Sequence, residues 1–146
     1  MEIMLFHLLK LEMVIIKISK KTFKRPSEIN IITVYDTSTQ KYVVFSKNPY
    51  TGKDLGDNVE YINCTTERGV LHAFIEFWKK DDYPDIVTAW NLNRFDMPYI
   101  VNRIRKVFGE EKLLELSPYE NFYESEAEDK FGRPYTKFSF GGVQII

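Results

Sequence analysis

The sequence has few of the residues that build disulfide-rich, metal-cluster or membrane proteins. Cys64 is the only cysteine, which excludes an internal disulfide and a multi-cysteine metal site. The two histidines, His7 and His72, have no partner at metal-ligand spacing. No apolar run approaches the roughly 20 residues that cross a bilayer, and Glu2 stands where a secretory signal would be basic. We therefore expect a cytoplasmic chain with no membrane contact.

The chain also lacks an excess of charge of either sign. Its 20 basic and 21 acidic residues give a net charge of -1, so the field of the whole protein does not attract polyanions, and any nucleic-acid contact must be local. One basic cluster lies within residues 17–25, and by itself it is typical of a solvated loop. With 146 residues, 44% of them hydrophobic, the sequence predicts a single domain over residues 1–146.

Hydrophobic patterning in the first half predicts strands followed by a helix. Residues 4–18 favour a buried strand or two, and residues 29–35 and 42–45 predict a β-hairpin. A short strand is expected at residues 59–62. Thr65 and Thr66 then precede a helix that ends near Lys79 and Lys80, where they are typical of an N-cap. The apolar stripe of this helix is Val70, Leu71, Phe74, Ile75 and Trp78.

The second half predicts a central strand, a second helix and a closing hairpin. Residues 86–90 are apolar on both faces, as in a strand covered by helices on both sides. The following helix has its apolar stripe within residues 100–108 and a stop at Gly109. The acidic segment 120–129 is expected to be a solvated loop or helix surface. Residues 138–146 predict a hairpin across two glycines. Together these elements indicate a mixed α/β fold.

One segment, residues 85–104, carries a pattern with chemical meaning. It places Asn91, Phe95 and Asp96 directly after the expected buried strand, and ligands of open α/β sheets bind at such strand ends. The segment resembles the second exonuclease motif of the family B DNA polymerases, most closely those of T-even-type phages. In that motif an Asn precedes an aromatic-Asp pair by a few residues. Further similar segments extend the resemblance over most of residues 28–146.

The resemblance implies a function and a set of site residues. It implies an RNase H-like mixed sheet flanked by helices, truncated at the C-terminus, from a proofreading 3′-5′ exonuclease that removes nucleotides from a single-stranded DNA 3′ end. Mg²⁺ or Mn²⁺ would be the metal. By the family's pattern, Asp96 matches a metal-binding catalytic residue, Asn91 lies near the terminal nucleotide, and Phe95 lines the strand-binding cleft. The alternative for Asp96 is a simple helix N-cap.

Elsewhere the sequence departs from the family pattern. The first motif, Asp-x-Glu, falls on residues 10–12, so Glu12 matches a catalytic metal ligand whereas Lys10 replaces the aspartate. The third motif, a Tyr three residues before an Asp, is not found before Ile146. We therefore expect a partial exonuclease domain that is inactive alone. Either another chain, such as a downstream polymerase chain, completes it, or it is a degraded or truncated copy; a further alternative is that residues 1–25 are unrelated to the family. The alternative function is a non-catalytic remnant that binds single-stranded nucleic acid or pairs with a polymerase chain.

Overall fold

A mixed sheet organises the computed structural model, which describes residues 11–16 and 28–146. Within those residues the main sheet has six strands in the order β4-β3-β2-β1-β5-β8. The pairs β1–β2 and β2–β3 are antiparallel, whereas the pairs β3–β4, β1–β5 and β5–β8 are parallel. The strands are β1 (Leu11–Ile16), β2 (Ile31–Asp36), β3 (Lys41–Ser46), β4 (Val59–Asn63), β5 (Ile86–Thr88) and β8 (Gln144–Ile145).

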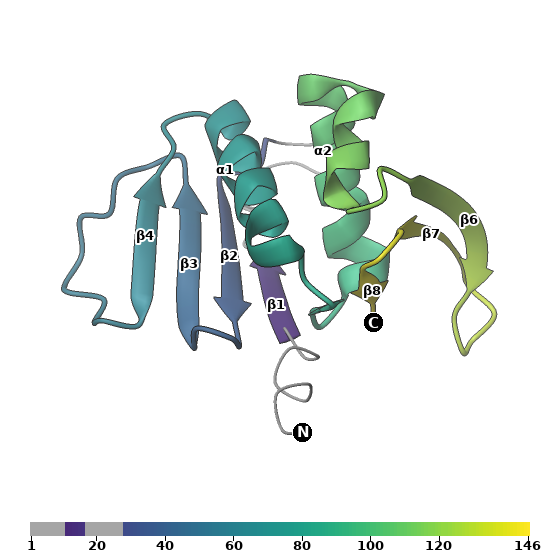
Figure 1. Ribbon diagram of the computed structural model, residues 1–146, viewed down its shortest axis with the longest axis horizontal. Helices are drawn as coiled ribbons and strands as arrows, with labels where there is room; N and C mark the ends of the chain where they lie inside the picture. Colours follow the sequence, from purple (N-terminus) through teal and green to yellow (C-terminus); the bar gives the residue numbers. More distant parts are fainter. Residues whose placement is uncertain (1–10, 17–27) are drawn as a thin grey trace.

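Two α-helices pack with this sheet, and a separate hairpin extends beyond them (Figure 1). The hairpin consists of β6 and β7, which form their own two-stranded sheet. The expected mixed α/β fold is therefore confirmed. The remaining elements are α1 (Glu67–Lys79), η1 (Lys80–Asp82), η2 (Leu92–Asp96), α2 (Met97–Phe108), η3 (Glu110–Leu116), β6 (Phe122–Glu128) and β7 (Pro134–Phe140).

Both α-helices begin and end where the sequence indicates. The Thr66 side chain accepts a hydrogen bond from the Gly69 N–H at 3.0 Å and so caps α1, as expected for a threonine at that position. Helix α2 has Pro98 in its first turn, where a missing N–H costs no helical bond. Its last turn is followed by Gly109 with φ of 97°, a backbone conformation that favours glycine.

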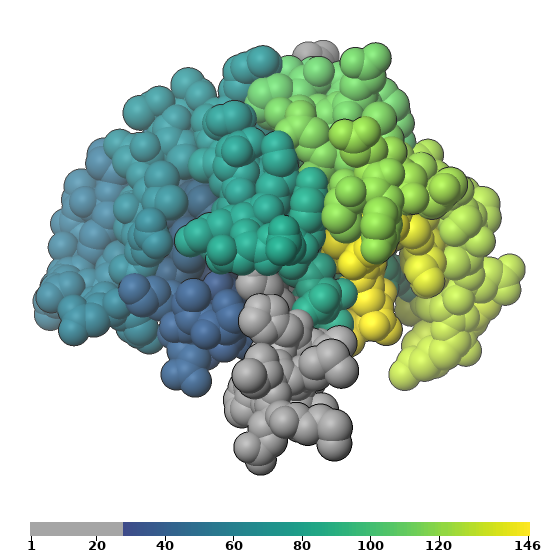
Figure 2. Space-filling view, in the orientation of Figure 1, coloured from purple at the N-terminus to yellow at the C-terminus, as the bar shows by residue number. Residues whose placement is uncertain are grey.

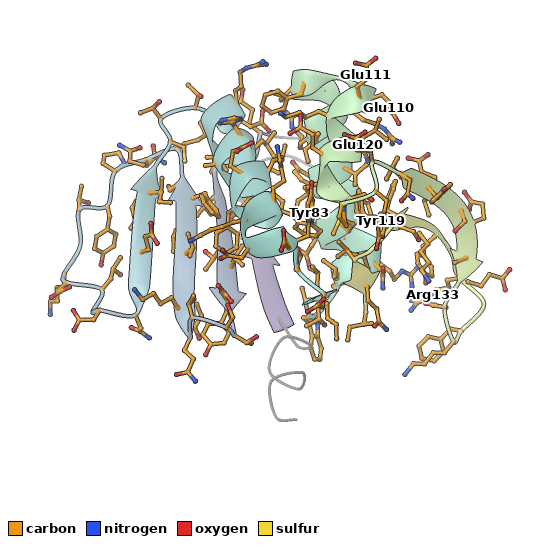
Figure 3. The ribbon with its side chains drawn as sticks, viewed as in Figure 1. Tyr83, Glu110, Glu111, Tyr119, Glu120 and Arg133 are labelled. Atoms are coloured by element: carbon orange, nitrogen blue, oxygen red, sulfur yellow. The ribbon has the colours of Figure 1, made fainter. Side chains whose placement is uncertain are left out.

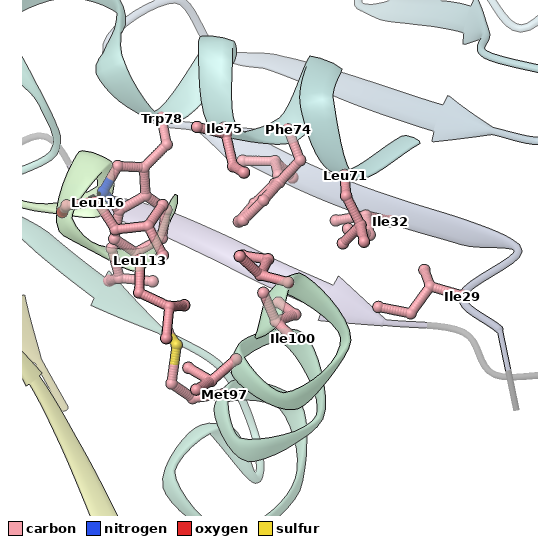
Figure 4. Packing of buried hydrophobic residues seen from close by; sticks show 14 of the residues in the cluster. Ile29, Ile32, Leu71, Phe74, Ile75, Trp78, Met97, Ile100, Leu113 and Leu116 are labelled. Atoms are coloured by element: carbon pink, nitrogen blue, oxygen red, sulfur yellow. Dashed lines mark hydrogen bonds between the residues drawn. The ribbon is translucent and has the colours of Figure 1, made fainter. Parts of the chain in front are cut away.

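The core lies between one face of the sheet and the two helices, as the close view in Figure 4 shows. Ile32 and Val34 alternate with half-buried residues along β2, so this strand presents one face to the core. The polar atom of the buried Trp78 is also paired, because its Nε1–H donates to the Leu116 carbonyl at 2.9 Å. This bond fixes η3 against α1.

A buried ion pair joins α1 to α2. Arg103 donates two hydrogen bonds to the Glu67 carboxylate, each 2.6 Å long, and both side chains are almost completely buried. The backbone N–H of Ile29 donates to the same carboxylate at 2.9 Å. One acid therefore connects the chain before β2, the first turn of α1 and the middle of α2.

The end of the chain differs from the predicted closing hairpin. Residues 138–140 belong to β7, which pairs with β6, whereas β8 lies parallel to β5 at the edge of the main sheet. Phe140 and Val143 form only an isolated bridge. The two adjacent glycines, read as a hairpin turn, lie between strands of different sheets. The prediction that residues 143–146 form a hairpin with residues 138–140 was therefore wrong.

Two other expectations also need correction. The acidic segment 120–129 was expected to be a loop or helix surface, but it contains strand β6, whose side chains are mostly exposed. Strand β5 ends at Thr88, and only its Val87 is fully buried, so the predicted strand 86–90 is shorter and is not buried on both faces. The basic cluster in residues 17–25 lies outside the described residues. No described helix is long and apolar enough to cross a membrane.

Candidate active site

The chain turns sharply where it leaves β5, in the segment that the sequence singles out. After Thr88 it passes Trp90, whose side chain is fully exposed, and then forms the single π-helical turn η2. The Asn91 carbonyl accepts the N–H of Phe95 at 2.9 Å and that of Asp96 at 3.5 Å. A π-helical turn of this kind is often found at functional sites. Here it places Asp96 at the junction of η2 and α2.

Asp96 is a buried carboxylate without a hydrogen-bond or ion-pair partner in the described part of the chain. It is 8% exposed, and burial raises its pKa above the usual value for aspartate. It occupies the N-cap position of α2, yet its side chain makes no capping hydrogen bond. The alternative of a simple helix cap is therefore not supported. An uncompensated buried carboxylate is costly unless a cation or a proton reaches it.

The backbone of β1 places Glu12 on the strand next to this turn. Segment η2 lies against β1, and Glu12 is opposite Asp36 on β2 and next to Val87 on β5. The register therefore places the backbone of Glu12 between these two residues. The structure describes only the backbone at Glu12, and Lys10 lies outside the described residues.

Asp36, the register partner of Glu12 on β2, already has hydrogen-bond partners. Its carboxylate accepts hydrogen bonds from the backbone N–H and hydroxyl of Ser38, at 2.8 and 2.6 Å, and from the Thr39 hydroxyl at 3.0 Å. Burial alone would raise the pKa of Asp36, but these hydrogen bonds outweigh it and lower the pKa. Asp36 therefore stabilises the turn between β2 and β3. Among the described side chains no three metal-binding acids, cysteines or histidines form a cluster.

Aromatic side chains gather on the surface beside Asp96. Phe95 is 46% exposed and stacks on Tyr99, with ring centroids 6.1 Å apart and an interplanar angle of 27°. Asn91 is also exposed, directly after Trp90. The sequence prediction included Asn91 and Phe95 but missed Trp90 and Tyr99. Both residues lie inside the motif. The full exposure of Trp90, which marks it as a candidate binding residue, could not be predicted from the sequence.

Segment η2 is also bound to the β6–β7 hairpin. Arg94 forms an ion pair with Asp129 at the hairpin turn, and its guanidinium lies 5.8 Å from the centroid of the Tyr135 ring. The pKa of Asp129 is lowered to about 2. The largest cause is the hydrogen bond from the Arg133 backbone N–H, and the Arg133 side chain and the Phe131 backbone N–H also contribute. Sequence reasoning missed this link because it assigned the acidic segment to a solvated surface.

Comparison with known proteins identifies the class to which this arrangement belongs. Residues 9–139 match the model of the exonuclease domain of DNA polymerase family B. The chain therefore belongs to this family. The matched region begins before Glu12, so it also includes the Lys10 position.

Individual relatives agree with the family match. The chain is 28% identical over 137 residues to the DNA-directed DNA polymerase of Escherichia phage RB69, and 27% identical over 146 residues to that of Enterobacteria phage T4. These matches cover 75% and 84% of this chain but only 15% and 16% of the phage polymerases. A shorter match, 39% identical over 51 residues, covers 35% of this chain and 4% of the DNA polymerase delta catalytic subunit of Caenorhabditis elegans.

Proposed function

We propose that this chain is the proofreading 3′-5′ exonuclease segment of a phage-type family B DNA polymerase, directed at the 3′ end of single-stranded DNA. The observation that carries the proposal is Asp96, a buried carboxylate with no described partner, at a strand end and within the matching family region. The family implies an RNase H-like fold, and a mixed sheet with helices packed on one face agrees with that class.

Each predicted site residue has a role in this proposal. Asp96 and Glu12 are the catalytic carboxylates and hold a divalent metal ion, Mg²⁺ or Mn²⁺, because hard cations prefer oxygen ligands. Phe95 supports an unpaired base by stacking, which any base allows. Asn91 contacts the terminal nucleotide. The position of η2 against β1 supports this grouping, since the turn that ends at Asp96 contacts the strand that bears Glu12.

The acids of this chain do not complete a two-metal site. Lys10 stands where the family pattern has an aspartate, and an ammonium about 5 Å from a divalent ion costs about 7 kcal/mol at an effective dielectric constant near 20. Two carboxylates beside a lysine therefore fit a pair of divalent ions poorly. We propose that residues 1–146 alone are not a competent nuclease and that a polymerase segment outside these residues, in the same or another chain, supplies the missing acids.

A direct test is to incubate the purified chain with labelled single-stranded DNA and Mn²⁺, beside an Asp96→Ala variant. We expect no release of mononucleotides from either protein. Adding a candidate polymerase chain that carries the third motif should produce mononucleotides with the wild-type chain and none with the variant. Cleavage by the unaccompanied wild-type chain that is lost in Asp96→Ala would overturn the claim of inactivity but support the site.

The second candidate function is a non-catalytic single-strand-binding or structural remnant. The exposed Trp90 and Phe95 favour this function, because stacking on aromatic surfaces needs no metal ion. Binding by such a remnant would weaken steeply with salt and would be indifferent to Mg²⁺. Binding that instead tightens with Mg²⁺ and depends on Asp96 would favour the exonuclease segment.

A further inference from the structure

A cavity lies between the start of α2 and the β6–β7 hairpin, and neither Trp90 nor Phe95 lines it. Its volume is about 400 Å³, and residues from η2, α2, β6 and β7 line it. This volume is within the range of small-molecule sites in proteins. In Figure 3 the label of Glu110, at the start of η3, lies near the top of the view, and that of Arg133, in the hairpin turn, lies lower down on the same side of the molecule. In the space-filling view of Figure 2 the hairpin projects from the body of the protein.

The two arginines that line the cavity are already neutralised. Arg105 donates to both oxygens of Glu110, at 2.6 and 2.9 Å, and also pairs with Glu124. Arg94 pairs with Asp129. A phosphate entering the cavity would have to displace a carboxylate from an arginine. The cavity therefore favours a ligand without charge.

The remaining lining groups suit a flat, polar-edged molecule. Pro98 and Phe138 provide apolar walls, and the Asn102 and Thr136 side chains provide hydrogen-bonding groups. Asn93 also lines the cavity, and its Oδ1 is buried with no hydrogen-bond partner among residues 11–16 and 28–146. An unsatisfied buried acceptor is unfavourable, so the Asn93 amide gains a hydrogen bond by turning toward an N–H donor in the cavity.

We infer that this cavity binds a nucleobase of single-stranded DNA, at a subsite distinct from the carboxylate site at Asp96. Nucleobases combine a flat stacking surface with N–H donors at the edge, which are the features that the walls and the Asn93 amide accommodate. Asn93 and Asp96 belong to the same turn, η2, so a strand whose end lies at Asp96 passes close to the cavity. The inference rests on the proposed function in that the ligand is single-stranded DNA.

The test uses nucleosides, because they have no phosphate and do not need an intact catalytic site. Deoxyadenosine is titrated into the full chain while the NMR signals of the Asn93 and Asn102 side-chain amides and of the Thr136 backbone amide are recorded. We expect saturable shifts of these signals. An analogue dimethylated at the exocyclic amine has no N–H there, and inorganic phosphate has no base, so both should give no saturable shifts at these positions.

Variants then assign the binding to individual side chains. Asn93→Leu removes the amide, and since its Oδ1 is unsatisfied the fold should tolerate the change. Losing one hydrogen bond should weaken deoxyadenosine binding about three- to tenfold. Thr136→Val, a substitution of similar shape, should weaken binding by a similar or smaller factor. Deoxyadenosine that binds both variants as well as wild type, or that shifts only signals at Phe95 and Tyr99, would overturn the inference.

The outcome is separable from that of the proposed function. Asp96→Ala should leave deoxyadenosine binding unchanged, whereas it should abolish metal-dependent cleavage in the assembled system. Nucleoside binding by the chain, together with no metal-dependent cleavage in the assembled system, would uphold the cavity and count against the exonuclease. Phosphate binding in place of nucleoside binding would show that the arginines exchange their carboxylates for an anion and would refute the nucleobase assignment.

Discussion

Arg94 and Asp129 form an ion pair that joins the turn carrying Asp96 to the tip of the β6–β7 hairpin. Asp129 also accepts hydrogen bonds from the backbone N–H groups of Phe131 and Arg133, both at 2.9 Å. A single carboxylate therefore shapes the hairpin turn and attaches it to the candidate site. The position of the hairpin relative to Asp96 should depend on the charge of that carboxylate.

The first prediction concerns acid sensitivity of the hairpin. Hydrogen bonds and ion pairs lower the pKa of Asp129 to about 2, below the unfolded value of about 3.9. A lowered acid pKa contributes stability that is present above the unfolded pKa and is lost as pH falls toward the folded one. Amide signals of Phe131 and Arg133 should therefore shift together between about pH 4 and 2. In Asp129→Asn these amides should exchange with solvent faster even at pH 6.

A matched control is Glu126→Gln, which changes a hairpin acid that has no ion pair with a described residue. This variant should keep slow exchange at Phe131 and Arg133. Equal exchange rates in Asp129→Asn and in the control would show that the Asp129 carboxylate does not hold the hairpin turn.

The second prediction concerns the buried pair between Glu67 and Arg103. Arg103→Met leaves a buried carboxylate with only the Ile29 N–H as partner among the described residues. Removing one member of a buried pair typically costs about 3–5 kcal/mol, and we expect this loss in the free energy of unfolding measured with urea. Lys112→Ala, which removes a surface ion pair with Glu115, should cost less than about 1 kcal/mol.

The double variant Glu67→Leu with Arg103→Met tests the physical reason. Replacing both charges with apolar groups avoids a lone buried charge, so part of the stability should return. Recovery should be incomplete because the Ile29 N–H loses its acceptor. A double variant less stable than Arg103→Met would contradict this explanation.

Periodicity predicted the elements whose side chains divide into buried and exposed sets. The apolar stripe from Val70 to Trp78 predicted helix α1, and the N-cap at Thr66 predicted where this helix begins. Partner strands were harder to predict, because an apolar segment such as residues 143–146 can pair with any available edge. Strand β8 pairs with β5 rather than with β7, and this long-range choice has no local signal. The exposed, acidic β6 has no strand pattern for a different reason, because neither of its faces is buried.

The candidate site divides in the same way. Asp96, Asn91 and Phe95 could be proposed from the sequence because the motif is contiguous. The burial of Asp96 and its lack of a cap hydrogen bond required the structure. The attachment of Arg94 to Asp129 joins residues 35 positions apart, so no local pattern could predict it. The pairing of Glu12 with Asp96 stays a prediction.

The third prediction concerns the cost of the buried acid at Asp96. Burial raises its folded pKa, so the charged form is less favourable in the folded state, and the fold loses stability as pH rises above the unfolded pKa of about 3.9. Asp96→Asn should therefore raise Tm at pH 7 and leave it nearly unchanged at pH 3, where both forms are neutral. A lower Tm at pH 7 for the variant would show that the carboxylate is compensated in the folded protein.

The fourth prediction concerns stacking beside the site. The two tryptophans differ in exposure, since Trp90 is fully exposed and Trp78 is buried. An oligonucleotide that stacks at the candidate site should quench the red-shifted emission of Trp90, and Trp90→Phe should remove that signal. Phe95→Ala should weaken binding by about 1–3 kcal/mol, as for loss of one stacked base. Tyr50→Ala, on the far side of the sheet beyond β3, should leave binding unchanged.

The fifth prediction concerns Lys10 and metal binding. If the charge of Lys10 opposes a divalent ion between Glu12 and Asp96, then Lys10→Asp removes a repulsion and adds an oxygen ligand. Lys10→Asn removes the charge and adds at most a neutral ligand. Mn²⁺ affinity, measured by electron paramagnetic resonance of the free ion, should therefore increase from wild type to Lys10→Asn to Lys10→Asp.

Asp96→Ala in the Lys10→Asp background should reverse most of that gain, because it removes the buried carboxylate from the same ion. Equal Mn²⁺ affinities for Lys10→Asp and Lys10→Asn would mean that position 10 does not face the metal. Residues 10 and 12 lie on the same face of any regular strand. An effect of Lys10 without an effect of Glu12→Gln would therefore place the ion outside the β1 edge and refute the assignment of Glu12.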